Sequence, residues 1–120
     1  MISKIRGEIE QAELTMDVML LRDIKRHFTD DVALMPGHRV VRGPDAIIKY
    51  HERLYEQFDA FDIRFIIESI HVLGGLAIEK GRTEGTVYPK NRPERKNSGT
   101  YLCVYELDEN DRWKMVRFSW

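Results

Sequence analysis

The apolar positions in the first part of the chain repeat every three or four residues, which is the period of an α-helix. The first such stripe predicts an amphipathic helix over residues 2–14, and its members are Ile2, Ile5, Ile9 and Ala12. Asp17 can cap a second helix, because an aspartate side chain accepts hydrogen bonds from the free N–H groups of a first turn. The buried face of this second helix is expected to carry Leu20, Leu21, Ile24 and Phe28.

A short apolar strand, "VALM", and a turn, "PGHR", follow these two helices. Gly43, Pro44 and Asp45 then mark the start of a third helix. Proline is tolerated at the first helical position, and an aspartate there faces the positive end of the helix dipole. The inner stripe of this helix is expected to contain Ile47, Ile48, His51, Leu54, Tyr55 and Phe58.

After residue 59 the hydrophobic period changes from 3.6 to 2, the period of a strand with one buried face. "FDIRFI" alternates in this way, Gly74–Gly75 is a hairpin signal, and "LAIEKGRTEGTVY" is the returning strand. "PKNRPERKNSG" is polar and contains two prolines, which predicts a long hairpin loop. Two further strands, "TYLCVYEL" and "RWKMVRFSW", are joined by the turn "DENDR".

Three helices followed by a meander of long strands are typical of an α+β fold. We therefore expect a single domain over residues 1–120, with the helices covering one face of a curved sheet. The strands from Phe61 to Trp120 should pair antiparallel, because hairpin connections join them in chain order.

Composition and charge exclude several classes of partner. The net charge is −1 and acidic and basic residues are mixed along the chain, so no basic stripe favours nucleic acid. No run of about 18 apolar residues suggests a membrane span, and the charged N-terminal segment does not resemble a signal peptide. The single cysteine, Cys103, cannot form an internal disulfide, which favours the reducing cytoplasm.

Four segments, in this order, resemble the nuclear transport factor 2-like superfamily, in its SnoaL-like or ketosteroid-isomerase-like branch. They are "FTDDVALMPG", "VVRGPDAI", "LAIEKGRTEGT" and "SGTYLCVYEL…RWKMVRFSW", and together they span nearly the whole chain. The resemblance implies a cone, in which a bent antiparallel sheet wraps around three N-terminal helices, with a pocket at the open end and usually a dimer. It does not imply one function, because the fold hosts isomerases, dehydratases, cyclases, epoxide hydrolases and non-catalytic modules.

Two positions depart from the pattern of the ketosteroid isomerases. Met35 stands where those enzymes have their proton-transferring aspartate, and a thioether cannot take a proton. Many relatives also have an acid after the basic residue of the last strand, where this chain has Arg117 followed by Phe118. Steroid isomerisation by the usual aspartate is therefore not expected.

Asp30 and Asp31 lie between the second helix and the "VALM" strand. A proton-sharing pair needs both carboxylates at one site, and a calcium loop needs further oxygen ligands after Asp31, which are absent. Aspartates readily bond to backbone N–H groups in turns, so we expect both to serve structure in a helix-to-strand connector.

Glu79 is the first candidate for a catalytic base. The alternation places it on one face with small or apolar residues, whereas Lys80, Arg82 and Glu84 share the other face. Burying a carboxylate is costly unless it forms an ion pair or takes part in catalysis. Glu79 is therefore either a catalytic base, the partner of an arginine in a structural ion pair, or turned outward by a bulge.

His51 is the second candidate base, because it lies on the inner stripe of the third helix. A neutral core histidine is the alternative. The facing of His71 is left open, and His27 and His38 are expected in water. No two histidines have the spacing of a metal site, so we expect no bound metal.

Tyr101 is the third candidate catalytic residue, as a hydrogen-bond donor to a carbonyl or enolate oxygen. A core tyrosine with a satisfied hydroxyl is the alternative, and Cys103 is expected to be a buried, inert thiol. The residues expected to line the pocket are Tyr50, Leu54, Cys103, Tyr105, Met35 and Phe118.

Two functions remain open at this point. One is a cofactor-independent isomerase, cyclase, dehydratase or other lyase acting on a hydrophobic carbonyl compound. The other is a non-catalytic ligand-binding or dimerisation module. The last strand should carry Trp113 and Met115 on one face and Phe118 and Trp120 on the other, which predicts a homodimer through the outer face of the sheet.

Overall fold

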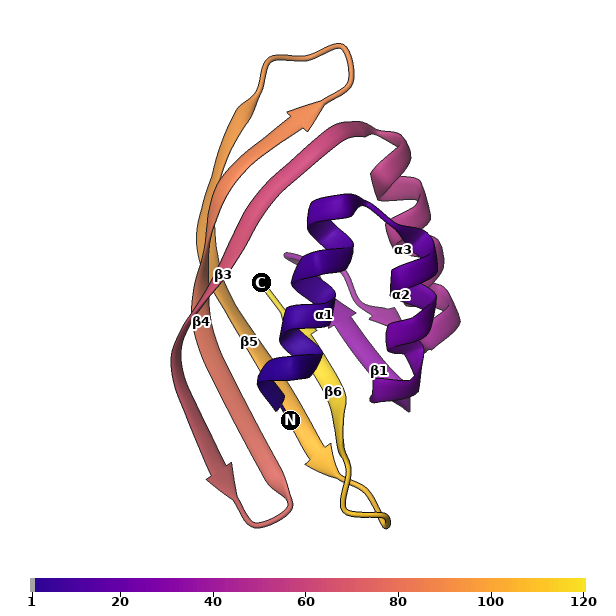
Figure 1. Ribbon diagram of the computed structural model, residues 1–120, viewed down its shortest axis with the longest axis vertical. Helices are drawn as coiled ribbons and strands as arrows, with labels where there is room; N and C mark the ends of the chain where they lie inside the picture. The colour runs from indigo at the N-terminus through magenta and orange to yellow at the C-terminus, as the bar shows by residue number, and fades with distance from the viewer. Residues whose placement is uncertain (1) are drawn as a thin grey trace.

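The helices lie against the concave face of a curved sheet (Figure 1). The computed structural model describes residues 2–120. Its first half contains α1 (Ile2–Thr15), α2 (Val18–Ile24), the 3₁₀ turn η1 (Lys25–His27), β1 (Phe28–Met35), β2 (Val41–Arg42) and α3 (Pro44–Glu56). Its second half contains β3 (Phe58–Leu73), β4 (Leu76–Pro89), β5 (Arg95–Leu107) and β6 (Trp113–Ser119). The α+β arrangement with a bent sheet around three helices is confirmed.

The six strands form one sheet in the order β2-β1-β6-β5-β4-β3. Strands β3 to β6 pair antiparallel with their neighbours in chain order, as the hairpin signals predict. Strand β1 pairs in parallel with β6, which joins the N-terminal half of the chain to the last strand. The sheet as a whole is therefore mixed, a feature that the short "VALM" run did not reveal.

Two glycines allow β3 and β4 to bend tightly around the helices. Gly85 has a φ of +152°, and a Cβ there would overlap the backbone oxygen of Asp62 on β3. A Cβ on Gly81 would overlap the backbone oxygen of Ile66. Only glycine permits such close approach of two backbones, so these positions maintain the curvature of the sheet.

Most residues of the predicted helical stripes form the core, but Phe28 and Phe58 begin strands β1 and β3 and do not belong to helices. Ile5, Ile9 and Ala12 of α1 are buried with Leu21 and Ile24 of α2. They pack on the concave face of β5 and β6 in one hydrophobic cluster. A second, smaller cluster lies where α3 meets β3 and β4, and it contains Tyr55, Phe61, Ile63 and Val87.

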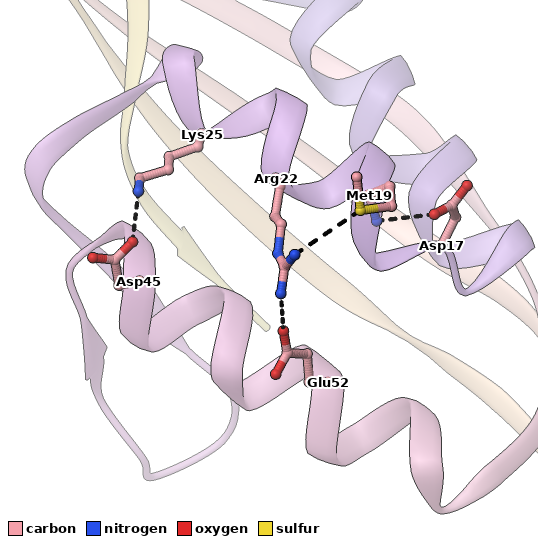
Figure 2. A network of polar contacts seen from close by, with 6 residues as sticks. All are labelled: Asp17, Met19, Arg22, Lys25, Asp45 and Glu52. Carbon is pink, nitrogen blue, oxygen red and sulfur yellow. Dashed lines mark hydrogen bonds and ion pairs between the residues drawn. The ribbon is translucent and has the colours of Figure 1, made fainter.

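Polar contacts on the outside of the helical layer connect α2 and η1 to α3, as Figure 2 shows. Asp17 caps α2 by accepting from the backbone N–H of Met19. Arg22 lies 2.9 Å from Glu52 and Lys25 lies 2.6 Å from Asp45. Exposed pairs of this kind contribute little stability each.

The placement of Asp30 and Asp31 differs from the predicted connector. Both lie inside β1 and both are exposed. The register between β1 and β6 shifts between Phe28 and Ala33, and this irregularity lets two adjacent side chains reach solvent. That the two aspartates serve structure alone stays a prediction.

The prediction of a long loop at residues 89–99 is wrong. Strand β5 begins at Arg95, which pairs with Val87 of β4, so the turn is much shorter. The end of this hairpin extends past the helices (Figure 1). Its two strands are exposed to solvent there. The sequence therefore lacks the hydrophobic alternation that would predict them.

The predicted facing of the last strand is also wrong. Tyr105 pairs with Met115 and Cys103 pairs with Phe118, so β6 has one extra residue between them. This bulge turns Met115 and Phe118 to the same concave face. Within β6, therefore, no aromatic side chain points outward, and that argument for a dimer is lost.

Candidate functional site

A cavity of about 220 Å³ lies between the helices and the concave face of the sheet. Its walls are mostly apolar, and the aromatic residues among them are Phe28, Tyr50, Phe58, Phe61, Phe65, Phe118 and Trp120. Its polar lining consists of a few groups besides Tyr50, namely Glu13, His51, Thr83, Arg95 and Asn97. A mostly apolar cavity with few polar groups is the usual form of a small-molecule site.

His51 and Glu13 form a pair in this lining. The inner stripe of α3 directs His51 inward, where it is only 4% exposed, and Glu13 comes from the last turns of α1. The Nε2 atom of His51 lies 3.0 Å from Oε1 of Glu13. Its Nδ1 atom lies 2.8 Å from the backbone oxygen of Ile47, so Nδ1 carries a proton and donates to that oxygen.

The two contacts of His51 decide its charge. Burial lowers the pKa of the imidazole, but the hydrogen bond and charge of Glu13 and the Ile47 carbonyl together outweigh it and raise that pKa. This direction favours the protonated imidazole, in agreement with the geometry, in which Nε2 faces a carboxylate oxygen of Glu13. His51 and Glu13 thus form a buried pair in the lining of an apolar cavity.

Tyr50 supplies a hydroxyl to the same cavity. Burial raises its pKa, the nearby Arg39 opposes this, and Glu13 adds to the rise. The guanidinium carbon of Arg39 lies 5.6 Å from the centre of the ring. The phenol thus stays protonated near neutral pH and can donate a hydrogen bond to a bound oxygen atom.

Glu79 faces inward, as the alternation predicts, and is fully buried. The structure places it outside the cavity lining, in a polar cluster between α1 and the sheet. Tyr101 donates to its Oε2 at 2.6 Å, Tyr105 donates to its Oε1 at 3.4 Å, and Nε of Arg6 lies 3.6 Å from Oε2. Burial raises the pKa of Glu79, against the two tyrosines and Arg6, which lower it.

The other expected site residues divide between the cavity lining and positions outside it. Tyr50, Leu54, His51 and Phe118 line the cavity, whereas Met35, Tyr101, Cys103 and Tyr105 do not. Burial raises the pKa of the Cys103 thiol, and the charge of Glu79 adds to this. Such a thiol is a poor nucleophile at neutral pH.

Within residues 2–120, no three His, Cys, Asp or Glu side chains gather closely enough to hold a metal ion. In the same part of the chain, no helix has the length and apolar character needed to cross a membrane.

Sequence reasoning missed Glu13, Arg95 and Asn97. Glu13 follows Ile9 by four residues, so a charged residue on the apolar stripe was the available signal. Arg95 and Asn97 lie on the same face of β5 as Tyr101, because side chains alternate along a strand. The sequence around them is polar and so did not predict a strand.

Comparison with known proteins identifies the fold. No family model matches the sequence, and no curated protein matches it. A ketosteroid isomerase-like protein from Erwinia carotovora atroseptica has a similar structure, with a TM-score of 0.83 at 20% identity over 98% of this chain and 90% of that one.

Two further solved structures agree. A nuclear transport factor 2-like superfamily protein from Salmonella enterica gives a TM-score of 0.79 at 17% identity, over 98% of this chain and 85% of that one. A protein of the same type from Shewanella oneidensis gives 0.76 at 17% identity, over 98% and 93%. The chain has the nuclear transport factor 2-like fold, and the resemblance noted in its sequence is confirmed for the fold.

Proposed function

We propose that the protein binds a small hydrophobic carbonyl compound in the cavity. It then removes a proton from the carbon next to the carbonyl group and returns it to the substrate. It would then be a cofactor-independent isomerase or lyase. The observation that supports this is the ion pair of His51 and Glu13 in the lining of an otherwise apolar cavity. Ionisable groups are costly in such surroundings, and catalytic acids and bases are common among those that occur there.

In this proposal Glu13 is the base. Its Oε1 is occupied by His51, and its Oε2 makes no hydrogen bond to another residue within 2–120, so Oε2 takes the proton. The electrons of the broken C–H bond form an enolate, and the Tyr50 hydroxyl donates to the enolate oxygen. Where the substrate has a carbon–carbon double bond one carbon further along, the enolate is a dienolate, and Glu13 returns the proton to its far (γ) carbon, which moves the double bond and completes an isomerisation. His51 positions the carboxylate through its contact with Oε1.

Proton exchange with solvent tests this proposal. The probe is 2-tetralone in D₂O, and the rate of deuterium entry beside its carbonyl group is followed by NMR at increasing protein concentration. We expect Glu13→Gln to lower the protein-dependent rate by about 10²–10⁴-fold, the usual contribution of a general base. Glu52→Gln, which removes a carboxylate next to His51 on α3 but outside the cavity, should keep the rate. Undiminished exchange in Glu13→Gln would exclude Glu13 as the base.

A non-catalytic binding module is the second candidate, and one observation favours it. Both ring nitrogens of His51 already contact partners within the protein, so the pair also serves to connect α1 to α3. If wild-type protein binds 2-tetralone without speeding its exchange, the pair is structural and the protein is a binding module.

We also propose a homodimer through the outer face of the sheet. Apolar side chains gather there on the β3–β4 hairpin and on the neighbouring part of β5: Leu73, Leu76, Ile78, Leu102 and Val104. Leu73 is 70% exposed and Leu76 is 43% exposed. A twofold axis would let this patch cover itself.

Val104→Lys should convert the dimer to a monomer, because it places a charge in the middle of the patch. Sedimentation equilibrium at micromolar concentration measures this. Ser98→Lys lies on the same face of β5, beside Glu84 and away from the patch, and should leave the dimer intact. A wild-type chain that is strictly monomeric at these concentrations would rule out the dimer.

For location, we propose the cytoplasm. The support is cysteine usage: Cys103 is a buried free thiol, so the fold does not use a disulfide. A reducing compartment is therefore compatible with everything that stabilises the described fold.

A further inference from the structure

Arg95 is a cation on the concave side of the sheet. It opens β5 and pairs with Val87, which is only 1% exposed and lies in the same cavity lining. Two residues further along the strand, Asn97 also lines the cavity and is half-buried. Both lie at the start of β5, next to the β4–β5 turn, and Arg95 is itself exposed, so the two residues lie at the rim.

The charge of Arg95 is not offset by the protein. Within residues 2–120 no carboxylate lies within 4 Å of its guanidinium group, whereas Arg22, Arg26 and Arg82 each have such a partner. The other charged groups of the lining, Glu13 and His51, neutralise each other. The cavity as a whole therefore has an excess positive charge at its rim, which favours an anionic ligand.

The walls indicate what else the ligand contains. Seven aromatic side chains contribute to the lining, and Phe65 and Trp120 each lie against Phe118, with ring centres 5.7 Å and 5.2 Å from it. Both contacts are edge-to-face, the arrangement that aromatic rings prefer, and such walls suit a flat aromatic body. An arginine suits a carboxylate, because its planar fork can donate two parallel hydrogen bonds.

We propose that Arg95 selects aromatic carboxylic acids, with the ring in the apolar cavity and the carboxylate held by Arg95 and the Asn97 amide at the rim. This deepens the proposed function and rests on it, since it takes the same cavity as the binding site. The substrate class is then an aromatic acid that also has a carbonyl group within reach of Glu13.

A matched pair of probes tests the selection. The full chain is titrated calorimetrically with 2-naphthoate and with 2-naphthamide, which share the ring system and differ in charge. We expect the wild type to bind 2-naphthoate about fivefold to tenfold more tightly than 2-naphthamide. The factor is modest because Arg95 is exposed to solvent, which weakens its interaction with the carboxylate. Arg95→Gln should abolish the preference, and Arg95→Lys should keep part of it, as a charge without the fork.

Arg92→Gln is the control, since it removes the same charge from the turn of the same hairpin, outside the lining. It should keep the full preference. The proposal is overturned if the wild type binds the amide as well as the acid, if it binds neither probe, or if Arg95→Gln keeps the preference.

These outcomes are separate from those of the exchange experiment. The ring carbons of 2-naphthoate have no proton that a carboxylate can remove, so its binding involves no turnover. A preference for the acid without exchange of 2-tetralone would leave the selection by Arg95 intact and remove the proposed catalysis. Exchange of 2-tetralone without any preference for the acid would remove the selection alone.

Discussion

Replacing Glu79 with alanine is expected to lower the free energy of unfolding by about 3–5 kcal/mol, the usual cost of removing one partner from a buried ionic cluster. The change leaves the Arg6 guanidinium, whose side chain is 14% exposed, without its carboxylate. It also leaves the Tyr101 hydroxyl without its acceptor. The space vacated by a fully buried side chain adds a cavity term. Urea denaturation measures the loss.

Two variants make this result specific. Glu84→Ala removes a carboxylate from the outer face of the same strand, where it is exposed, and should change stability by no more than about 0.5 kcal/mol. Glu79→Gln keeps an acceptor for Tyr101, so it should be less harmful than alanine and should still bind 2-naphthoate as the wild type does. A marked loss of binding by folded Glu79→Gln would show that Glu79 acts on the cavity, contrary to its position.

Gly85→Ala is expected to destabilise the protein by at least about 3 kcal/mol, because strain at an unfavourable backbone conformation and a direct overlap add together. The φ of +152° at this position is one that residues with a Cβ rarely adopt. The new Cβ would meet the Asp62 carbonyl, which is backbone and cannot rotate away. The bend of β3 and β4 would have to relax, and urea denaturation again measures the cost.

Gly99→Ala provides the matched control on the neighbouring strand. The nearest atom to a Cβ there is Oγ1 of Thr83 at 3.8 Å, an ordinary contact, so stability should change by less than about 1 kcal/mol. Gly85 pairs with Ile63 and Asn97, which both line the cavity. Any Gly85→Ala protein that folds should therefore also bind 2-naphthoate more weakly. Wild-type stability in Gly85→Ala would contradict the tight bend.

Side-chain direction is what the sequence predicted well. The helical stripe placed His51 inside, and the alternation of β4 separated the face of Glu79 from that of Lys80 but left open a bulge at Glu79, which the structure excludes. Both follow from the local period of the backbone, which needs no knowledge of distant segments. The α+β order of elements follows from the same change of period, and the resemblance of four segments supplied the bent sheet.

The predictions of strand facing were wrong where the backbone departs from the regular two-residue period. A bulge in β6 turns Met115 and Phe118 to one face, and an irregular stretch of β1 exposes Asp30 and Asp31 together. One extra residue reverses every later side chain in a strand, and the amino-acid pattern does not indicate where it is inserted.

By itself the sequence determined the helices, the order of the hairpins and the inward direction of His51. Only the tertiary structure decided that His51 meets Glu13 in the cavity, that Glu79 meets Arg6 and Tyr101 beneath α1, and that Arg95 reaches the rim. The reason is physical. Direction is set by neighbouring residues along the chain, whereas partners are chosen by the packing of α1 against α3 and the sheet, which depends on the whole core at once.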